Sequence, residues 1–131
     1  MRIMSAVVEL FYMMIMADGH VDNKELEMGR EMAKLEGFDI SEFNNQVEEL
    51  LSSEKDVYEQ CLRGMKTLSR EDQTRFLAWM CLIANADGFM HSDEWNLIYR
   101  IYHKELKLDR QSILDQQFLL KKELMGKSVH F

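Results

Sequence analysis

One short phrase occurs twice in this chain and constrains its fold more than any other feature. The tripeptide Ala-Asp-Gly at positions 17–19 is followed by Glu25, and 69 positions later the same tripeptide at 86–88 is followed by Glu94. Each copy comes after an almost wholly apolar stretch and leads into an amphipathic one. Because an internal repeat identifies the unit from which a fold is built, the sequence predicts a helix, an Asp-Gly turn and a helix, used twice.

The composition favours an all-α fold. The chain has no Pro and only 6 Gly in 131 residues, so it contains few residues that break helices. Its abundant Met, Leu, Glu, Lys and Gln are good helix formers, and apolar residues recur at helical spacing in seven segments. We therefore predict a single domain over 1–131, a compact bundle of about seven helices. Its repeat units would cover about 3–36 and 72–106, and a loose tail would cover 126–131.

Local signals predict where the helices begin. The first helix runs from about Ile3 to Ala17, and Asp22 and Glu25 form a candidate capping box for the second. The expected start signals of the later helices are, in chain order, Asp39 or Ser41, Ser52 or Ser53, Ser69, Ser92 and Asp109. The expected apolar stripe of the last helix is Ile113, Leu114, Phe118, Leu119 and Leu120.

Four conspicuous side chains are expected in the core. Trp79 and Trp95 lie in helical patterns and favour packing over a cofactor site. Cys61 and Cys81 lie twenty positions apart without a Cys-x-x-Cys motif, which indicates buried thiols in a reducing compartment, with a disulfide as the alternative.

The charge distribution limits the partners. Net charge is −7, and residues 18–59 alone hold 13 acidic and 4 basic side chains. An acidic first half argues against nucleic-acid binding but allows a cation or a basic protein partner; the alternative is that these acids solvate exposed helix faces. The apolar stretch 3–17 is shorter than a membrane span and contains Glu9. We therefore expect a cytoplasmic protein without membrane insertion.

The two aspartates of the Asp-Gly turns stand where a helix ends. Carbonyl groups make that end partially negative, so Asp18 and Asp87 are each unfavourable there by roughly 0.3–1 kcal/mol. Because the same unfavourable aspartate occurs in both repeats, its presence needs an explanation. One reason is structural: each Asp accepts hydrogen bonds from the next helix, and the Glu seven residues later caps that helix's first turn.

The other reason is a metal site. The candidate ligands are Asp18, Glu25, Asp87 and Glu94, with Asp22 and Asp93 as additional oxygens. Carboxylates favour hard ions such as Ca²⁺, Mg²⁺ or Mn²⁺, and two turns that face each other across a pseudo-twofold axis could share one ion. The spacing is not that of an EF-hand, which needs Gly at position 6 and Glu at position 12 of its loop.

Other candidate sites carry weaker signals. His20 and His91 are expected to be exposed loop histidines rather than ligands. The methionines at 13, 14 and 16 are expected to fill the core rather than to bind a soft metal. No phosphate-binding loop, nucleophile elbow or zinc-spaced cluster occurs, so we expect no enzyme and no organic cofactor.

The residues around both turns resemble the TerB-like family, which includes the tellurite-resistance protein TerB and the N-terminal domain of the DnaJ-like co-chaperone DjlA. The resemblance rests on 16–25, 84–94 and the apolar helices before them, and it spans roughly 1–110. It implies a helical bundle with an internal duplication, in which paired acidic residues form a metal-binding or ion-sensing site. It also implies a bacterial protein tied to tellurite and other chemical stress, phage defence and membrane-associated complexes.

Three functions follow from these observations. The first is a non-catalytic, stress-associated TerB-like protein that binds a divalent cation at the turns and contacts other proteins. The second is a pure interaction domain, accessory or co-chaperone-like, in which the paired Asp and Glu are helix caps. The third is a metal-dependent hydrolase that uses the carboxylates. An exposed apolar patch on the Met-rich and aromatic helices would also allow a homodimer.

Overall fold

The computed structural model describes residues 2–86, 88 and 90–129, and folds them as helices joined by short turns. No strand occurs within these ranges, so the prediction of an all-α fold is confirmed. The elements are α1 (Arg2–Ile15), α2 (Asn23–Leu35), α3 (Ile40–Ser53), α4 (Tyr58–Lys66), α5 (Arg70–Ala84), α6 (Ser92–Tyr99), the π-helical segment η1 (Arg100–Glu105) and α7 (Arg110–Val129).

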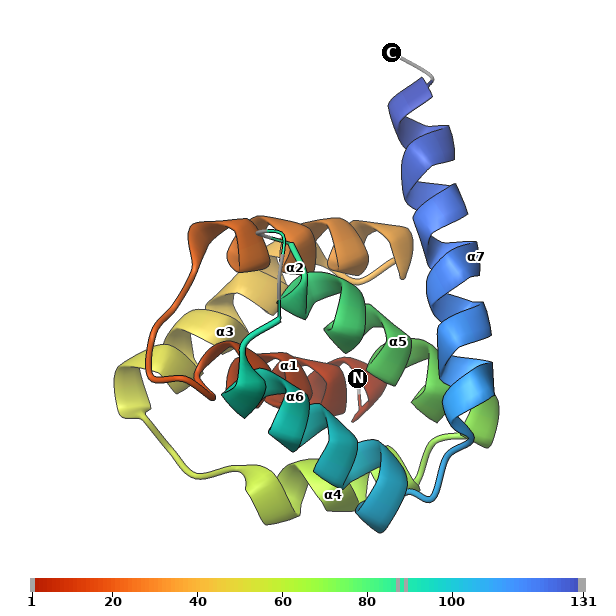
Figure 1. Ribbon diagram of the computed structural model, residues 1–131. Coiled ribbons are helices and arrows are strands. Elements are labelled where there is room, and N and C mark those ends of the chain that lie inside the picture. The colour runs from red at the N-terminus through yellow and green to blue at the C-terminus, as the bar shows by residue number, and fades with distance from the viewer. Residues whose placement is uncertain (1, 87, 89, 130–131) are drawn as a thin grey trace.

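The two apolar helices, α1 and α5, form the centre of the molecule. α1 packs against α2, α3, α4, α5 and α6, and Figure 1 shows it surrounded by the other helices. In α5 every residue from Phe76 to Ala84 is buried. A helix that is apolar on most sides must be covered on most sides, which is why these two segments occupy the core.

The internal repeat is visible in the backbone. In the first turn the Gly19 amide donates to the Met16 carbonyl at 2.9 Å, and in the second the Gly88 amide donates to Asn85 at 3.0 Å. Both glycines have positive φ, +76° and +108°, which a residue with a side chain rarely adopts. The second helix of each repeat packs on the first helix of the other, α2 on α5 and α6 on α1.

Most of the expected helix starts agree with the structure. The structure selects Asp39 rather than Ser41 for α3, and α6 begins at Ser92 with His91 as its N-cap. The capping acceptors, with the backbone amides that donate to them, are Asp22 (Lys24, 2.7 Å), Asp39 (Glu42, 2.9 Å), Ser69 (Asp72, 3.1 Å) and Asp109 (Ser112, 3.0 Å).

The start of α4 was predicted wrongly. Ser52 and Ser53 belong to the last turn of α3, which ends at Glu54 in the left-handed conformation. α4 begins only at Tyr58, whose amide donates to the Asp56 carboxylate at 3.1 Å. Val57, just before α4, is buried. Residues 54–57 connect the two helices. The Asp56 carboxylate takes the capping role that was expected of Ser52 or Ser53.

The core expectations hold for three of the four conspicuous side chains. Trp79 is fully buried, and its indole N–H donates to Glu36 Oε2 at 2.8 Å. Cys61 and Cys81 are buried free thiols. Trp95 does not lie in the core: 37% of it is exposed, because α6 lies on the surface and its ring packs beside the half-exposed Tyr99.

The loose tail expected over 126–131 is helical over its described part, 126–129, and positions 130–131 lie outside the described residues. α7 continues as a helix through Val129, and its C-terminal half extends beyond the rest of the bundle in Figure 1. Its expected single apolar stripe is divided, because Ile113 and Leu120 are buried whereas Leu114, Phe118 and Leu119 are exposed. Within the described ranges, no helix combines the length and the apolar character that crossing a membrane requires.

Candidate cation site at the Asp-Gly turns

Two glutamates from equivalent positions of the repeat meet inside the protein. Glu25 lies in the first turn of α2 and Glu94 in the first turn of α6. Only 2% of Glu25 and 0% of Glu94 are exposed to solvent. The two carboxyl groups lie close enough together for Glu94 to raise the pKa of Glu25. Fully buried glutamates are rare unless they are paired with another group. Here the contact between the repeats pairs two carboxyl groups, which would repel each other if both were charged.

The pair resolves this conflict by holding a proton. Burial, the contact with Glu94 and the negative charges of Asp22 and Asp18, in that order of importance, together raise the pKa of Glu25 to about 9. At neutral pH the Glu25 carboxyl group is therefore protonated and donates to the Glu94 carboxylate.

Glu94 has one satisfied oxygen and one orphaned oxygen. Its Oε1 accepts a hydrogen bond from the His91 amide at 3.3 Å, which caps α6. Its Oε2 is buried and accepts no hydrogen bond from the described residues unless the Glu25 carboxyl group carries a proton. A shared proton or a bound cation would satisfy this oxygen, since a buried polar atom without a partner costs about 1–3 kcal/mol.

Two aspartates add negative charge around this pair. Asp18 Oδ1 accepts from the His20 amide at 3.0 Å, inside the turn, and Asp22 caps α2. Asp18 Oδ2 lies 3.6 Å from the His91 imidazole Nε2 of the second repeat. Both aspartates lie close enough to Glu25 to raise its pKa. The first turn is thus tied to α6 as well as to α2.

The structure assigns the other expected ligands differently. Asp87 lies outside the described residues. Asp93 is exposed and lines a groove of about 410 Å³ beside the end of α1, rather than facing the glutamates. Asp22 and Glu94 cap their helices, whereas Asp18, for which capping was also expected, accepts the His20 amide inside the turn and not an amide of α2. Glu25 does not cap its helix either, because its carboxyl group turns to Glu94 and accepts no backbone amide among the described residues.

The described positions hold no group of three or more His, Cys, Asp or Glu side chains already arranged to bind a metal ion. The carboxylate oxygens of Asp18, Asp22, Glu25 and Glu94 nevertheless suit hard divalent ions rather than soft ones. Of the two histidines, His20 is exposed as expected, whereas His91 is half-buried beside Asp18. Sequence reasoning missed that contact, although His91 stands at the repeat position of Asp22, at the start of α6.

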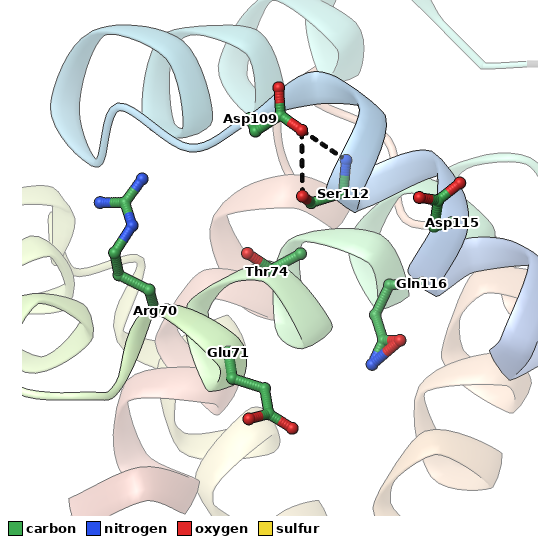
Figure 2. Close-up of a pocket in the computed structure, with 7 residues that line it drawn as sticks. All are labelled: Arg70, Glu71, Thr74, Asp109, Ser112, Asp115 and Gln116. Atoms are coloured by element: carbon green, nitrogen blue, oxygen red, sulfur yellow. Dashed lines mark hydrogen bonds between the residues drawn. The ribbon is translucent and has the colours of Figure 1, made fainter.

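A second hollow lies between the start of α5 and α7, and Figure 2 shows its lining. It measures about 420 Å³. Its polar groups serve the local structure: Asp109 accepts from the amide and hydroxyl of Ser112, and the Arg70 guanidinium donates to the Lys107 carbonyl at 2.6 Å. These contacts hold helix ends together, and none of them leaves a buried acid or base for chemistry.

Comparison with known proteins finds a matching family. The model of a family described as "Tellurite resistance protein TerB" matches residues 4–114, which is most of the chain and includes both Asp-Gly turns. No curated protein matches the sequence. No solved structure matches it either.

Proposed function

Since this chain belongs to the TerB family and is therefore a domain associated with tellurite resistance, we propose that it binds a divalent cation at its Asp-Gly turns. We further propose that it is not an enzyme and that it acts through contacts with other proteins. Ca²⁺, Mg²⁺ and Mn²⁺ are the ions that its oxygen ligands favour.

One observation carries the proposal: Glu25 and Glu94 interact inside the protein, and Glu94 Oε2 is buried without a hydrogen-bond partner on the described residues unless a proton or a cation lies between the two side chains. An evolved core usually avoids two facing carboxylates, because burying charge costs several kcal/mol unless it is compensated. A divalent cation would replace the proton and neutralise both groups. Asp18 and Asp22 supply further negative charge nearby, and the repeat places Asp87 at the position equivalent to Asp18.

Thermal unfolding tests the proposal. Chelator-treated protein should melt at a higher temperature when Ca²⁺, Mg²⁺ or Mn²⁺ is added, because a ligand that binds only the folded state stabilises it. Glu25→Gln should abolish this rise and still fold, since its amide can donate to Glu94 as the protonated carboxyl group does. Glu27→Gln, on the exposed face of the same helix, is the matched control and should respond like the wild type.

A second function is favoured by the capping contacts of Asp22 and Glu94. In a pure interaction domain the acidic surface over 18–59 would bind a basic partner, and no cation would be needed. Such binding would weaken steeply with salt. If millimolar cations leave the melting temperature unchanged, this second function replaces the first.

A further inference from the structure

The long helix α7 is apolar on two of its faces. Ile113 and Leu120 are buried against the bundle. On another face Leu114, Phe118 and Met125 are 44%, 59% and 68% exposed. Their spacings of four and seven residues place them on one stripe, and Lys121 occupies the remaining position of that stripe. We call Leu114, Phe118, Lys121 and Met125 the α7 seam. An exposed stripe of this kind marks an interaction surface.

We propose that the seam pairs with the α7 seam of a second copy of this chain, with the two helices antiparallel about a twofold axis. The axis would pass between Phe118 and Lys121. Leu114 then faces the partner's Met125, and Phe118 faces the partner's Lys121. A twofold interface repeats each of these contacts, so every seam residue has a partner. This inference does not depend on the proposed cation site.

The lysine of the seam explains why the helices run antiparallel. In a parallel pair the two Lys121 ammonium groups would meet and repel each other. In the antiparallel pair each ammonium group lies over an aromatic ring, which attracts it. The ring already accepts one cation within its own chain, because Lys122 Nζ lies 4.6 Å from the Phe118 centroid.

Charged residues beside the seam are complementary in the same orientation. Asp115 and Lys122 flank one side of the seam, seven residues apart. Within one helix this spacing separates them by about 10.5 Å along the axis, too far for an ion pair. In the antiparallel pair each Asp115 lies opposite the partner's Lys122, so two ion pairs form between the chains. This charge complementarity favours a second copy over an unrelated apolar partner.

The position of α7 leaves the seam accessible. The C-terminal half of α7 extends beyond the bundle in Figure 1, where a second helix can approach without displacing another element. The seam covers about three helical turns, which is short for an interface. We therefore expect a weak dimer, with a dissociation constant of roughly micromolar order that depends on the seam.

Sedimentation over a range of protein concentrations tests the proposal. Wild-type chain should show a reversible monomer–dimer equilibrium, and Phe118→Glu should raise the dissociation constant by about 30-fold or more, as loss of an aromatic anchor does. Leu119→Glu is the control, because Leu119 is 53% exposed but lies about 100° further around the helix. Circular dichroism should show the same helix content for all three proteins.

Two further experiments test the orientation. Asp115→Lys and Lys122→Asp should each weaken the dimer about tenfold, and the double variant should restore it, because the ion pair exists only between chains. In a mixture of Leu114→Cys and Met125→Cys chains, mild oxidation should link one variant to the other, and neither variant to itself.

Several results would overturn the proposal. They are a protein that stays monomeric up to millimolar concentration, a dimer that tolerates Phe118→Glu, a charge reversal without rescue, or Met125→Cys chains that link to each other. Glu25→Gln should leave the dissociation constant unchanged. Failure of the dimer and failure of the cation site can therefore be told apart.

Discussion

At the scale of single residues, the proposed cation site depends on Glu25 and Glu94. The repeat predicted that these two positions are equivalent, and the sequence therefore identified them as candidates. It could not show that α2 and α6 bring their carboxyl groups into contact or bury them almost completely. Both facts depend on how the two repeats pack, as does the contact between Asp18 and His91. Sequence spacing holds no information on either.

The shared proton makes stability depend on pH. The pKa of Glu25 is raised from about 4.5 in the unfolded chain to about 9, so between these values the folded state holds a proton that the unfolded state has lost. The stabilisation is complete below the lower value and is lost as pH rises through the upper one. Without cations, the free energy of unfolding of the wild type should fall relative to Glu25→Gln by up to about 1.4 kcal/mol per pH unit.

Urea unfolding of both proteins from pH 5 to pH 9, in the presence of a chelator, checks this dependence. If the difference in free energy of unfolding between the wild type and Glu25→Gln does not change with pH across this range, Glu25 does not hold the proton.

Gly29 makes room for the core. A Cβ atom at this position would lie 2.4 Å from Cζ of Phe11, a buried ring that packs beside Phe43 at a centroid distance of 5.7 Å. Gly29→Ala should therefore destabilise the protein by about 1–3 kcal/mol through overpacking, despite the better helix propensity of Ala. Gly126→Ala is the control, because nothing lies within 4 Å of a Cβ there. Equal unfolding midpoints in urea would show that the core accommodates the methyl group.

At the scale of elements, local signals predicted most helix starts because caps act locally. Asp39, Ser69 and Asp109 each accept a backbone amide two or three residues inside their helix. The predicted start of α4 was wrong, because Ser52 and Ser53 at the end of α3 are residues of the type that also caps helix starts. The π-helical turns of η1 and the exposure of Trp95 were also missed, since both depend on how α6 packs on its neighbours.

The two serines provide a matched test of the observed boundaries. Ser69 caps α5 by accepting from the Asp72 amide at 3.1 Å, so Ser69→Ala should lower the free energy of unfolding by about 0.5–2 kcal/mol. Ser53 lies in the last turn of α3, where its exposed hydroxyl donates to the Leu50 carbonyl at 3.4 Å and accepts no amide at a helix start, so Ser53→Ala should change the free energy of unfolding by less than about 0.5 kcal/mol. Denaturant unfolding of the two variants measures this difference. The reverse order of stabilities would contradict the assignment of α3 and α4.

At the scale of the whole molecule, one duplication accounts for both the core and the candidate site. The apolar helix of each repeat becomes a central helix, α1 or α5, and each is contacted by the amphipathic helix of the other repeat. This packing of each amphipathic helix on the other repeat brings Glu25 and Glu94 together. α7 lies outside the repeat, and its exposed seam supplies a separate surface through which two copies of the chain would associate.

The measurement that tests the central claim most directly is calorimetric titration of Ca²⁺, Mg²⁺ and Mn²⁺ into chelator-treated protein. The wild type and the exposed-site control Glu27→Gln should bind one ion per chain, and Glu25→Gln should bind none at the same concentrations. Binding that survives in Glu25→Gln, or wild-type protein that takes up no ion at millimolar concentration, would contradict the cation site. The buried glutamates would then be a proton-sharing contact between the two repeats.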